Sequence, residues 1–110
     1  SGRITGIVLM TRSKSYQEYL IAALADPLEA ADYLNVALED GDKELFLLAL
    51  RNVAEARLGG ISQLATATGL NRENLYRMLS GKGNPELKSL DRLLRALGLK
   101  LVVEADSDAA

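Results

Sequence analysis

Helix start and stop signals recur along this chain, and they constrain its fold more than any other feature. Asp26 is a capping acid placed directly before Pro27, a residue that favours the first position of a helix, and Glu29 is placed to reach back to the cap. Gly41 stands where a left-handed residue ends a helix, and Asp42 follows it as the next cap. The chain is therefore divided into short helices.

Between these signals, apolar side chains recur at the spacing of three to four residues that places them on one helix face. The pattern predicts helices over 15–25, 27–40, 43–58, 61–68, 71–79 and 85–97, the last one capped by Asn84 and begun by Pro85. The residues expected to face the core are Tyr16, Leu20, Ala23, Leu24, Ala31, Leu34, Leu38, Phe46, Ala49, Leu50, Val53, Leu90, Leu93, Leu94 and Leu97. The predicted fold class is all-α: a compact domain of five to six helices.

The two ends of the chain are expected to lie outside this single domain, which spans residues 15–104. Ser1-Gly2 looks like the remnant of a cleaved tag, so residues 1–14 are expected to be tag-derived or disordered. The alternative for this segment is a short strand over residues 4–10. Residues 105–110 are expected to form a disordered tail.

One segment does not fit the helical pattern. Leu101, Val102 and Val103 are strand formers in a run too short for a helix, which predicts a short strand over residues 100–104. Because the chain offers no clear second strand, this one is expected to pair with the same strand of another copy, which would make the protein a homodimer.

Composition excludes several classes of function. The chain has no cysteine and no histidine, which removes disulfides, thiol and imidazole catalysis and the usual zinc sites. No carboxylates stand in a recognisable catalytic spacing, so we expect no enzyme activity, no catalytic residue, no metal and no cofactor. The longest apolar run is too short to cross a bilayer, and we expect a soluble, cytoplasmic protein without a membrane partner.

Within residues 61–80, three residues carry the steric pattern of a helix-turn-helix. A small residue, Ala65, lets two helices approach closely, Gly69 takes the backbone conformation of a sharp turn, and Leu75 fills the angle between the helices. These roles depend on one another, so their coincidence is more specific than any one of them. The motif predicts that this segment binds double-stranded DNA.

The outer face of the second helix carries side chains suited to a major groove. An arginine can donate two hydrogen bonds to the edge of a guanine, and an asparagine can form two with an adenine. The predicted base-reading residues are therefore Arg72, Asn74 and Arg77. Tyr76 either packs on the DNA backbone or closes the edge of the core. The remaining candidate DNA contacts, mostly to phosphate, are Ser62, Gln63, Asn71, Lys82, Asn84 and Lys88. The competing interpretation is that these arginines are ordinary solvated charges.

The net charge of −2 is unevenly distributed. Residues 59–100 carry seven Lys/Arg and three Asp/Glu, whereas residues 1–58 carry six and nine. A basic segment beside an acidic one is compatible with DNA binding by the middle of the chain. The alternative is that charge fluctuates this much by chance, so charge alone does not establish a nucleic-acid partner.

Segments 59–65, 68–77, 79–85 and 93–99 resemble addiction-module antidote proteins, which have a Cro/repressor-type (XRE-like) helix-turn-helix. The resemblance covers about residues 19–104. One departure is Ile61, where many repressors place a glutamine that contacts phosphate.

The resemblance implies an antitoxin that neutralises a small basic RelE-like toxin and represses its own operon as a dimer. The acids expected to hold such a toxin are Asp32, Glu39, Asp40 and Asp42, for which a solvated helix face is the alternative interpretation. The alternative functions are a prophage-type repressor without a toxin partner and a module that binds only protein.

Overall fold

The computed structural model describes residues 14–107, and within them every regular element is a helix. The six helices are α2 (Lys14–Ala23), α3 (Pro27–Asp40), α4 (Lys43–Leu58), α5 (Ile61–Thr68), α6 (Arg72–Met78) and α7 (Leu87–Ala96). The all-α prediction of five to six helices is confirmed for this part of the chain. The tag-derived segment and the alternative strand at residues 4–10 lie outside the described residues.

The predicted starts and stops of α3 and α4 are confirmed. The Leu28 N–H donates to the Asp26 carboxylate over 2.9 Å, and Pro27 is the first residue of α3. Gly41 ends α3 with φ +78°. Asp42 then caps α4, accepting hydrogen bonds from the N–H groups of residues 44 and 45. These contacts keep the turn between the helices short.

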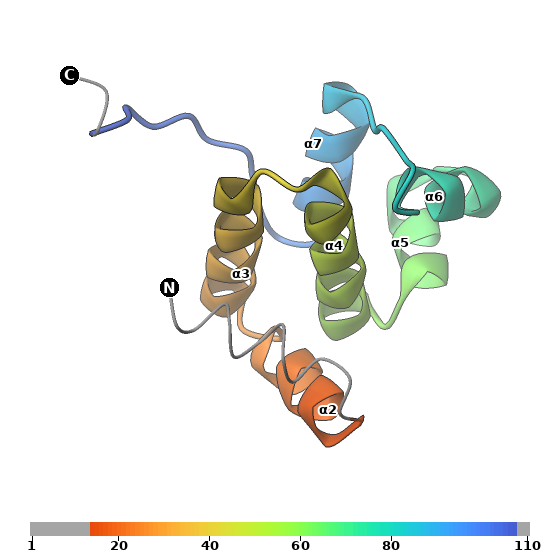
Figure 1. Ribbon diagram of the computed structural model, residues 1–110. Coiled ribbons are helices and arrows are strands. Elements are labelled where there is room, and N and C mark those ends of the chain that lie inside the picture. The colour runs from red at the N-terminus through yellow and green to blue at the C-terminus, as the bar shows by residue number, and fades with distance from the viewer. Residues whose placement is uncertain (1–13, 108–110) are drawn as a thin grey trace.

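Helix α4 lies at the centre of the fold. It packs against α2 and α3 on one side and against α5 on the other, and α5 in turn contacts α6 and α7 (Figure 1). Its inward residues are fully or almost fully buried, as predicted: Phe46, Ala49, Leu50 and Val53. As a result, α3 and α6 lie on opposite sides of α4.

The face that α3 turns inward differs from the predicted one. Ala30 and Ala37 are buried beside Leu34, whereas Leu38, expected to face the core, is 52% exposed. Small side chains at the contact let α3 pack closely on α4, and this places the neighbouring leucine at the surface.

Helix α7 begins later than predicted. Asn84 and Pro85 were expected to open it, but the N-cap is Glu86 and the first helical residue is Leu87. The buried stripe of α7 starts near Leu90, so an earlier turn would add no apolar contact to the core. The end of α7 is as predicted, with Gly98 at φ +81°.

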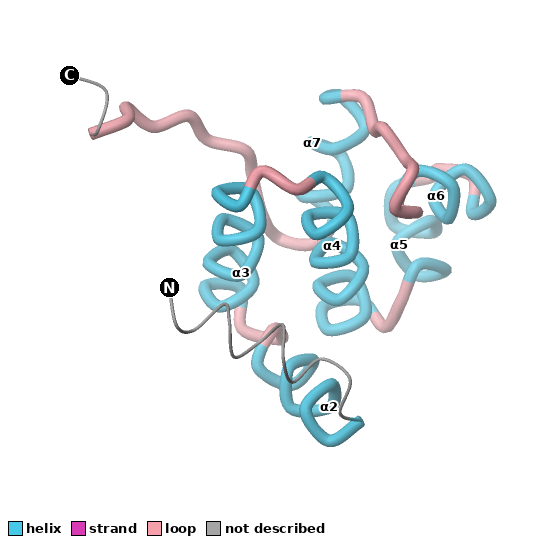
Figure 2. The backbone as a smooth tube through the Cα atoms, viewed as in Figure 1, coloured by secondary structure: helices cyan, strands magenta, loops and turns pink. Residues whose placement is uncertain are grey.

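The predicted strand at residues 100–104 is not present. This segment has no regular secondary structure and leaves the helices as an exposed tail (Figures 1 and 2). A strand needs a ladder partner, and no described residue of the same chain supplies one.

Candidate nucleic-acid interface

Helices α5 and α6 are joined by a turn with a left-handed residue at its corner. Gly69 has φ +73° and donates its N–H to the carbonyl of Ala65, which ends α5. The Thr68 hydroxyl donates to the Leu64 carbonyl over 2.8 Å and accepts the N–H of Leu70 over 3.3 Å. The polar groups of the turn are therefore satisfied locally, which defines how the chain enters α6.

Asn71 caps α6. Its side-chain oxygen accepts hydrogen bonds from the N–H groups of Glu73 (2.8 Å) and Asn74 (3.2 Å). Because the oxygen is used in this way, the NH2 group of the Asn71 side chain is the part that could donate to a phosphate. This candidate DNA residue therefore also has a structural role as the N-cap of α6.

The two faces of α6 differ sharply in exposure. Leu75 is completely buried and Leu79, just after the helix, is 1% exposed. The base-reading candidates Arg72, Asn74 and Arg77 are exposed. The buried leucine therefore anchors a short helix that carries polar and cationic side chains on its solvent side.

Arg72 and Tyr76, one helical turn apart, interact with each other. The Arg72 guanidinium carbon lies 5.6 Å from the centre of the Tyr76 ring, within the range of a cation–π contact. Tyr76 is 45% exposed. The ring supports the arginine on the outer face of α6, a third arrangement beside the two that were considered for this tyrosine.

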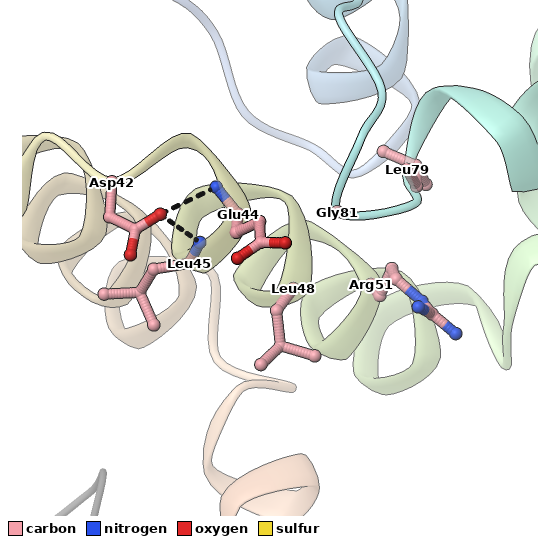
Figure 3. A pocket seen from close by; sticks show the side chains of 7 residues that line it. All are labelled: Asp42, Glu44, Leu45, Leu48, Arg51, Leu79 and Gly81. Atoms are coloured by element: carbon pink, nitrogen blue, oxygen red, sulfur yellow. Dashed lines mark hydrogen bonds between the residues drawn. The ribbon is translucent and has the colours of Figure 1, made fainter.

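The loop between α6 and α7 is packed tightly at two glycines. Gly83 is buried, and a Cβ atom on it would overlap the main-chain carbonyl of Met78. At Gly81 the loop reaches α4 beside the Glu44 side chain (Figure 3). The DNA candidates Lys82 and Asn84 are exposed on the same loop, so both are carried by a segment that is tied to α6 and α4.

The other predicted phosphate contacts lie at helix starts. Ser62 and Gln63 are in the first turn of α5. Ser62 is half-buried, and Gln63 is exposed with its side chain near Gly59 and Gly60. Lys88 is exposed in the first turn of α7. The three residues therefore lie on α5, which precedes α6, and on α7, which follows it.

The four acids predicted to bind a partner do not form one group. Asp32 and Glu39 line a groove on α3, and Asp40 is exposed at the end of that helix. Asp42 uses its carboxylate to cap α4 and borders a different, smaller pocket (Figure 3). The structure thus associates two of the predicted acids with one concave surface.

Sequence reasoning missed Gly83 and Glu44 as residues that shape this region. Gly83 lacks the positive φ that marks most functional glycines, so only its position in a Gly-Lys-Gly loop could have drawn attention to it. Glu44 lies far from the loop in sequence and shows no local pattern. Over residues 14–107, no helix is long and apolar enough to cross a membrane, and no group of three acids, histidines or cysteines could hold a metal ion.

Comparison with known proteins gives the family. The family model for a probable addiction module antidote protein matches residues 15–105. A Haemophilus influenzae protein described only as uncharacterized is 42% identical over 72 residues, which is 66% of this chain and 72% of that protein. No solved structure matches. Because the family model covers most of the chain, including all of the helices from α3 to α7, the protein belongs to the family of probable addiction module antidote proteins.

Proposed function

We propose that this antidote binds operator DNA through α5 and α6, which would act as a repressor-type helix-turn-helix with α6 in the major groove. Arg72, Asn74 and Arg77 would read bases, and the loop residues Lys82 and Asn84 would contact phosphate. In this proposal the protein represses its own operon and neutralises a small basic RelE-like toxin, and it is not an enzyme.

The two-faced character of α6 carries the proposal. Its inner face is fixed by Leu75, which is fully buried, so the outer face has one orientation relative to the fold. Arginine and asparagine side chains on such a face match the donor and acceptor pattern of guanine and adenine edges. The stacking of Arg72 on Tyr76 further restricts where its guanidinium can reach.

Charge supports the same surface. Helices α5 to α7 and their loops, residues 61–96, carry six Lys/Arg and three Asp/Glu although the whole chain has a net charge of −2. Cations that neutralise phosphates release condensed counterions, so binding would weaken steeply with salt. Glu73 is an exception, because its negative charge is repelled by phosphate. Its position in the first turn of α6 stabilises the helix instead, through the positive end of the helix dipole.

The proposal includes a homodimer, because repressors of this class read two half-sites. Val103 is 98% exposed in the tail, and a symmetric pairing of residues 101–104 from two copies would cover it. Light scattering of the wild type and of Val103→Asp tests this route: a dimer that becomes a monomer is the expected result, and a monomeric wild type would contradict it.

The decisive experiment measures binding of the full chain to its own promoter duplex and to a scrambled duplex over a salt series. We expect preference for the promoter, with affinity falling as salt rises. The variant Arg72→Ala with Arg77→Ala should keep its circular dichroism spectrum and lose most of the preference, since each bidentate contact to a base contributes about 1–3 kcal/mol of discrimination.

A matched control removes two exposed basic side chains outside residues 61–96, in Lys43→Ala with Lys100→Ala. It lowers the net charge by the same amount and should retain promoter discrimination. Equal loss in both double variants would show that total charge, and not the α6 face, governs binding. Absence of any promoter preference in the wild type would leave a module that binds only protein.

A further inference from the structure

A groove of about 890 Å³ runs between α3 and the tail that follows α7. Phe46 of α4 and Leu94 of α7 contribute to its lining, and Leu28 and Leu38 of α3 stand on one side. Leu101 and Val102 of the tail stand on the other. We call this surface the α3–tail groove. Apolar grooves on protein surfaces commonly receive the apolar face of an amphipathic helix.

Several apolar side chains that line the α3–tail groove are exposed to solvent. Leu28 is 79% exposed and Leu38 52%, because Ala30 and Ala37 occupy the inward positions of α3. Across the groove, Val102 is 70% exposed. Apolar side chains that cluster around a concave surface mark an interaction site more strongly than the same residues scattered over the protein.

The charge around the groove is one-sided along α3. Residues 20–42 contain six Asp/Glu and no Lys/Arg, and two of these acids, Asp32 and Glu39, line the groove itself. Lys100 and Arg95 line the opposite side, where Arg95 lies 3.6 Å from Asp91 in an ion pair. An apolar surface with an acidic wall complements a segment that is apolar on one face and cationic on the other.

We propose that the α3–tail groove docks a cationic amphipathic helix of the antidote's protein partner, with apolar side chains of that helix between Leu28, Leu38 and the tail. This inference rests on the proposed function for the existence of a basic toxin and adds where and how it binds. Basic side chains of the docked helix would face Asp32 and Glu39.

A second copy of this chain is a poorer occupant than a cationic helix. Pairing α3 with its own copy would bring two helices together that each carry four acids and no basic residue. Like charges brought together at an interface cost binding free energy, and there is no cation on either helix to offset it.

The test uses a synthetic peptide of leucine and lysine, about 15 residues long, with its leucines on one helical face. The full chain is titrated into the labelled peptide and binding is followed by fluorescence anisotropy. A second peptide in which glutamate replaces lysine is the charge control. We expect the lysine peptide to bind, to weaken as salt rises, and to bind better than the glutamate peptide.

Two double variants and two matched controls localise the binding. Leu28→Ser with Leu38→Ser removes exposed apolar groups, and binding should weaken by about tenfold or more. Leu48→Ser with Leu87→Ser changes two comparably exposed leucines, of α4 and α7, and should leave binding unchanged. Asp32→Asn with Glu39→Gln should weaken binding and flatten its salt dependence, whereas Glu18→Gln with Glu55→Gln, on α2 and α4, should not.

Failure of the inference and failure of the proposed function are distinguishable. Equal binding of the lysine peptide by the wild type and both groove variants, or no binding at all, overturns the groove assignment. The same variants are then tested against the small protein encoded beside the antidote gene. If the wild type binds that protein and the groove variants bind it equally well, the toxin role stands and the groove assignment is wrong. If the wild type does not bind that protein while its binding of the lysine peptide still depends on the groove residues, the toxin role is wrong.

Discussion

Arg57 of α4 donates a hydrogen bond from its Nε to the main-chain oxygen of Leu97, over 3.0 Å, at the point where α7 ends. Its Nη1 also donates to the carbonyl of Ala25, between α2 and α3, over 2.6 Å. One half-buried guanidinium therefore joins three parts of the chain that are distant in sequence. The tail that forms one side of the α3–tail groove leaves α7 directly after this contact.

Replacing Arg57 should destabilise the fold. We expect Arg57→Ala to lower the free energy of unfolding by about 2 kcal/mol, because two charge-assisted hydrogen bonds to main-chain carbonyls are lost. Arg57→Lys should recover only part of this, since one ammonium cannot reproduce the planar fork. Urea unfolding followed by circular dichroism measures both. The exposed Arg51→Ala is the control, and an equal loss there would show that the bonds of Arg57 contribute nothing specific.

Asn52 is the one buried polar side chain among the described residues, and it links three helices. It accepts from Gln17 of α2 over 3.1 Å and donates to the Tyr33 hydroxyl of α3 over 3.0 Å. Asn52→Ala should lower the free energy of unfolding by about 2 kcal/mol, because both partners lose a bond in a partly buried site. Asn35→Ala, on the exposed side of α3, should change it by less than about 0.5 kcal/mol in the same urea experiment. Similar values for the two variants would refute this role.

Burial raises the pKa of the Tyr33 hydroxyl above its ordinary value of 10.0, an effect that the hydrogen bond from Asn52 partly opposes and nearby Tyr16 increases. Above that pH the unfolded chain releases the proton while the folded protein still holds it. The folded state then binds more protons, so stability falls as pH rises past about 10. Tyr33→Phe should show a smaller fall between pH values of about 8 and 11 than the wild type. Equal slopes in urea unfolding would exclude a contribution from Tyr33.

Gly83 should tolerate no side chain. In Gly83→Ala the new Cβ would overlap the carbonyl of Met78, which is main chain and cannot swing away, so we expect a loss of about 2 kcal/mol and weaker promoter binding. At Gly81 the atom nearest to an added Cβ, at 2.6 Å, is an oxygen of the Glu44 carboxylate, the end of an exposed and flexible side chain. Gly81→Ala should therefore cost little. Thermal unfolding of the pair distinguishes them, and equal Tm values would contradict the argument.

Local chemistry predicted the helices well and the tertiary contacts poorly. Caps such as Asp26 and Asp42 act over two or three residues, so the sequence shows them directly. The start of α7 was predicted wrongly by the same reasoning. Asn84 and Pro85 are a favourable local sequence for a helix start, but the helix begins at Leu87, closer to its apolar stripe.

The candidate site shows the same division. The outward position of Arg72, Asn74 and Arg77 follows from helical periodicity, which the sequence carries. The α3–tail groove does not, since it depends on Ala30 and Ala37 displacing Leu38 from the core and on where the tail lies after Leu97. No pattern within one helix encodes the position of a segment more than fifty residues away.

The DNA face and the α3–tail groove should be occupied at the same time. They share no residue, and α3 and α6 lie on opposite sides of α4 (Figure 1). The protein saturated with promoter duplex should therefore bind the leucine–lysine peptide with an affinity within about threefold of the free protein, a small coupling by the standard of allosteric systems. The peptide also binds DNA through its charge, so the complex of Leu28→Ser with Leu38→Ser on the same duplex supplies the background to subtract. Displacement of the peptide by DNA would show that the two surfaces overlap or exclude each other, and would remove the groove as a site available on the operator.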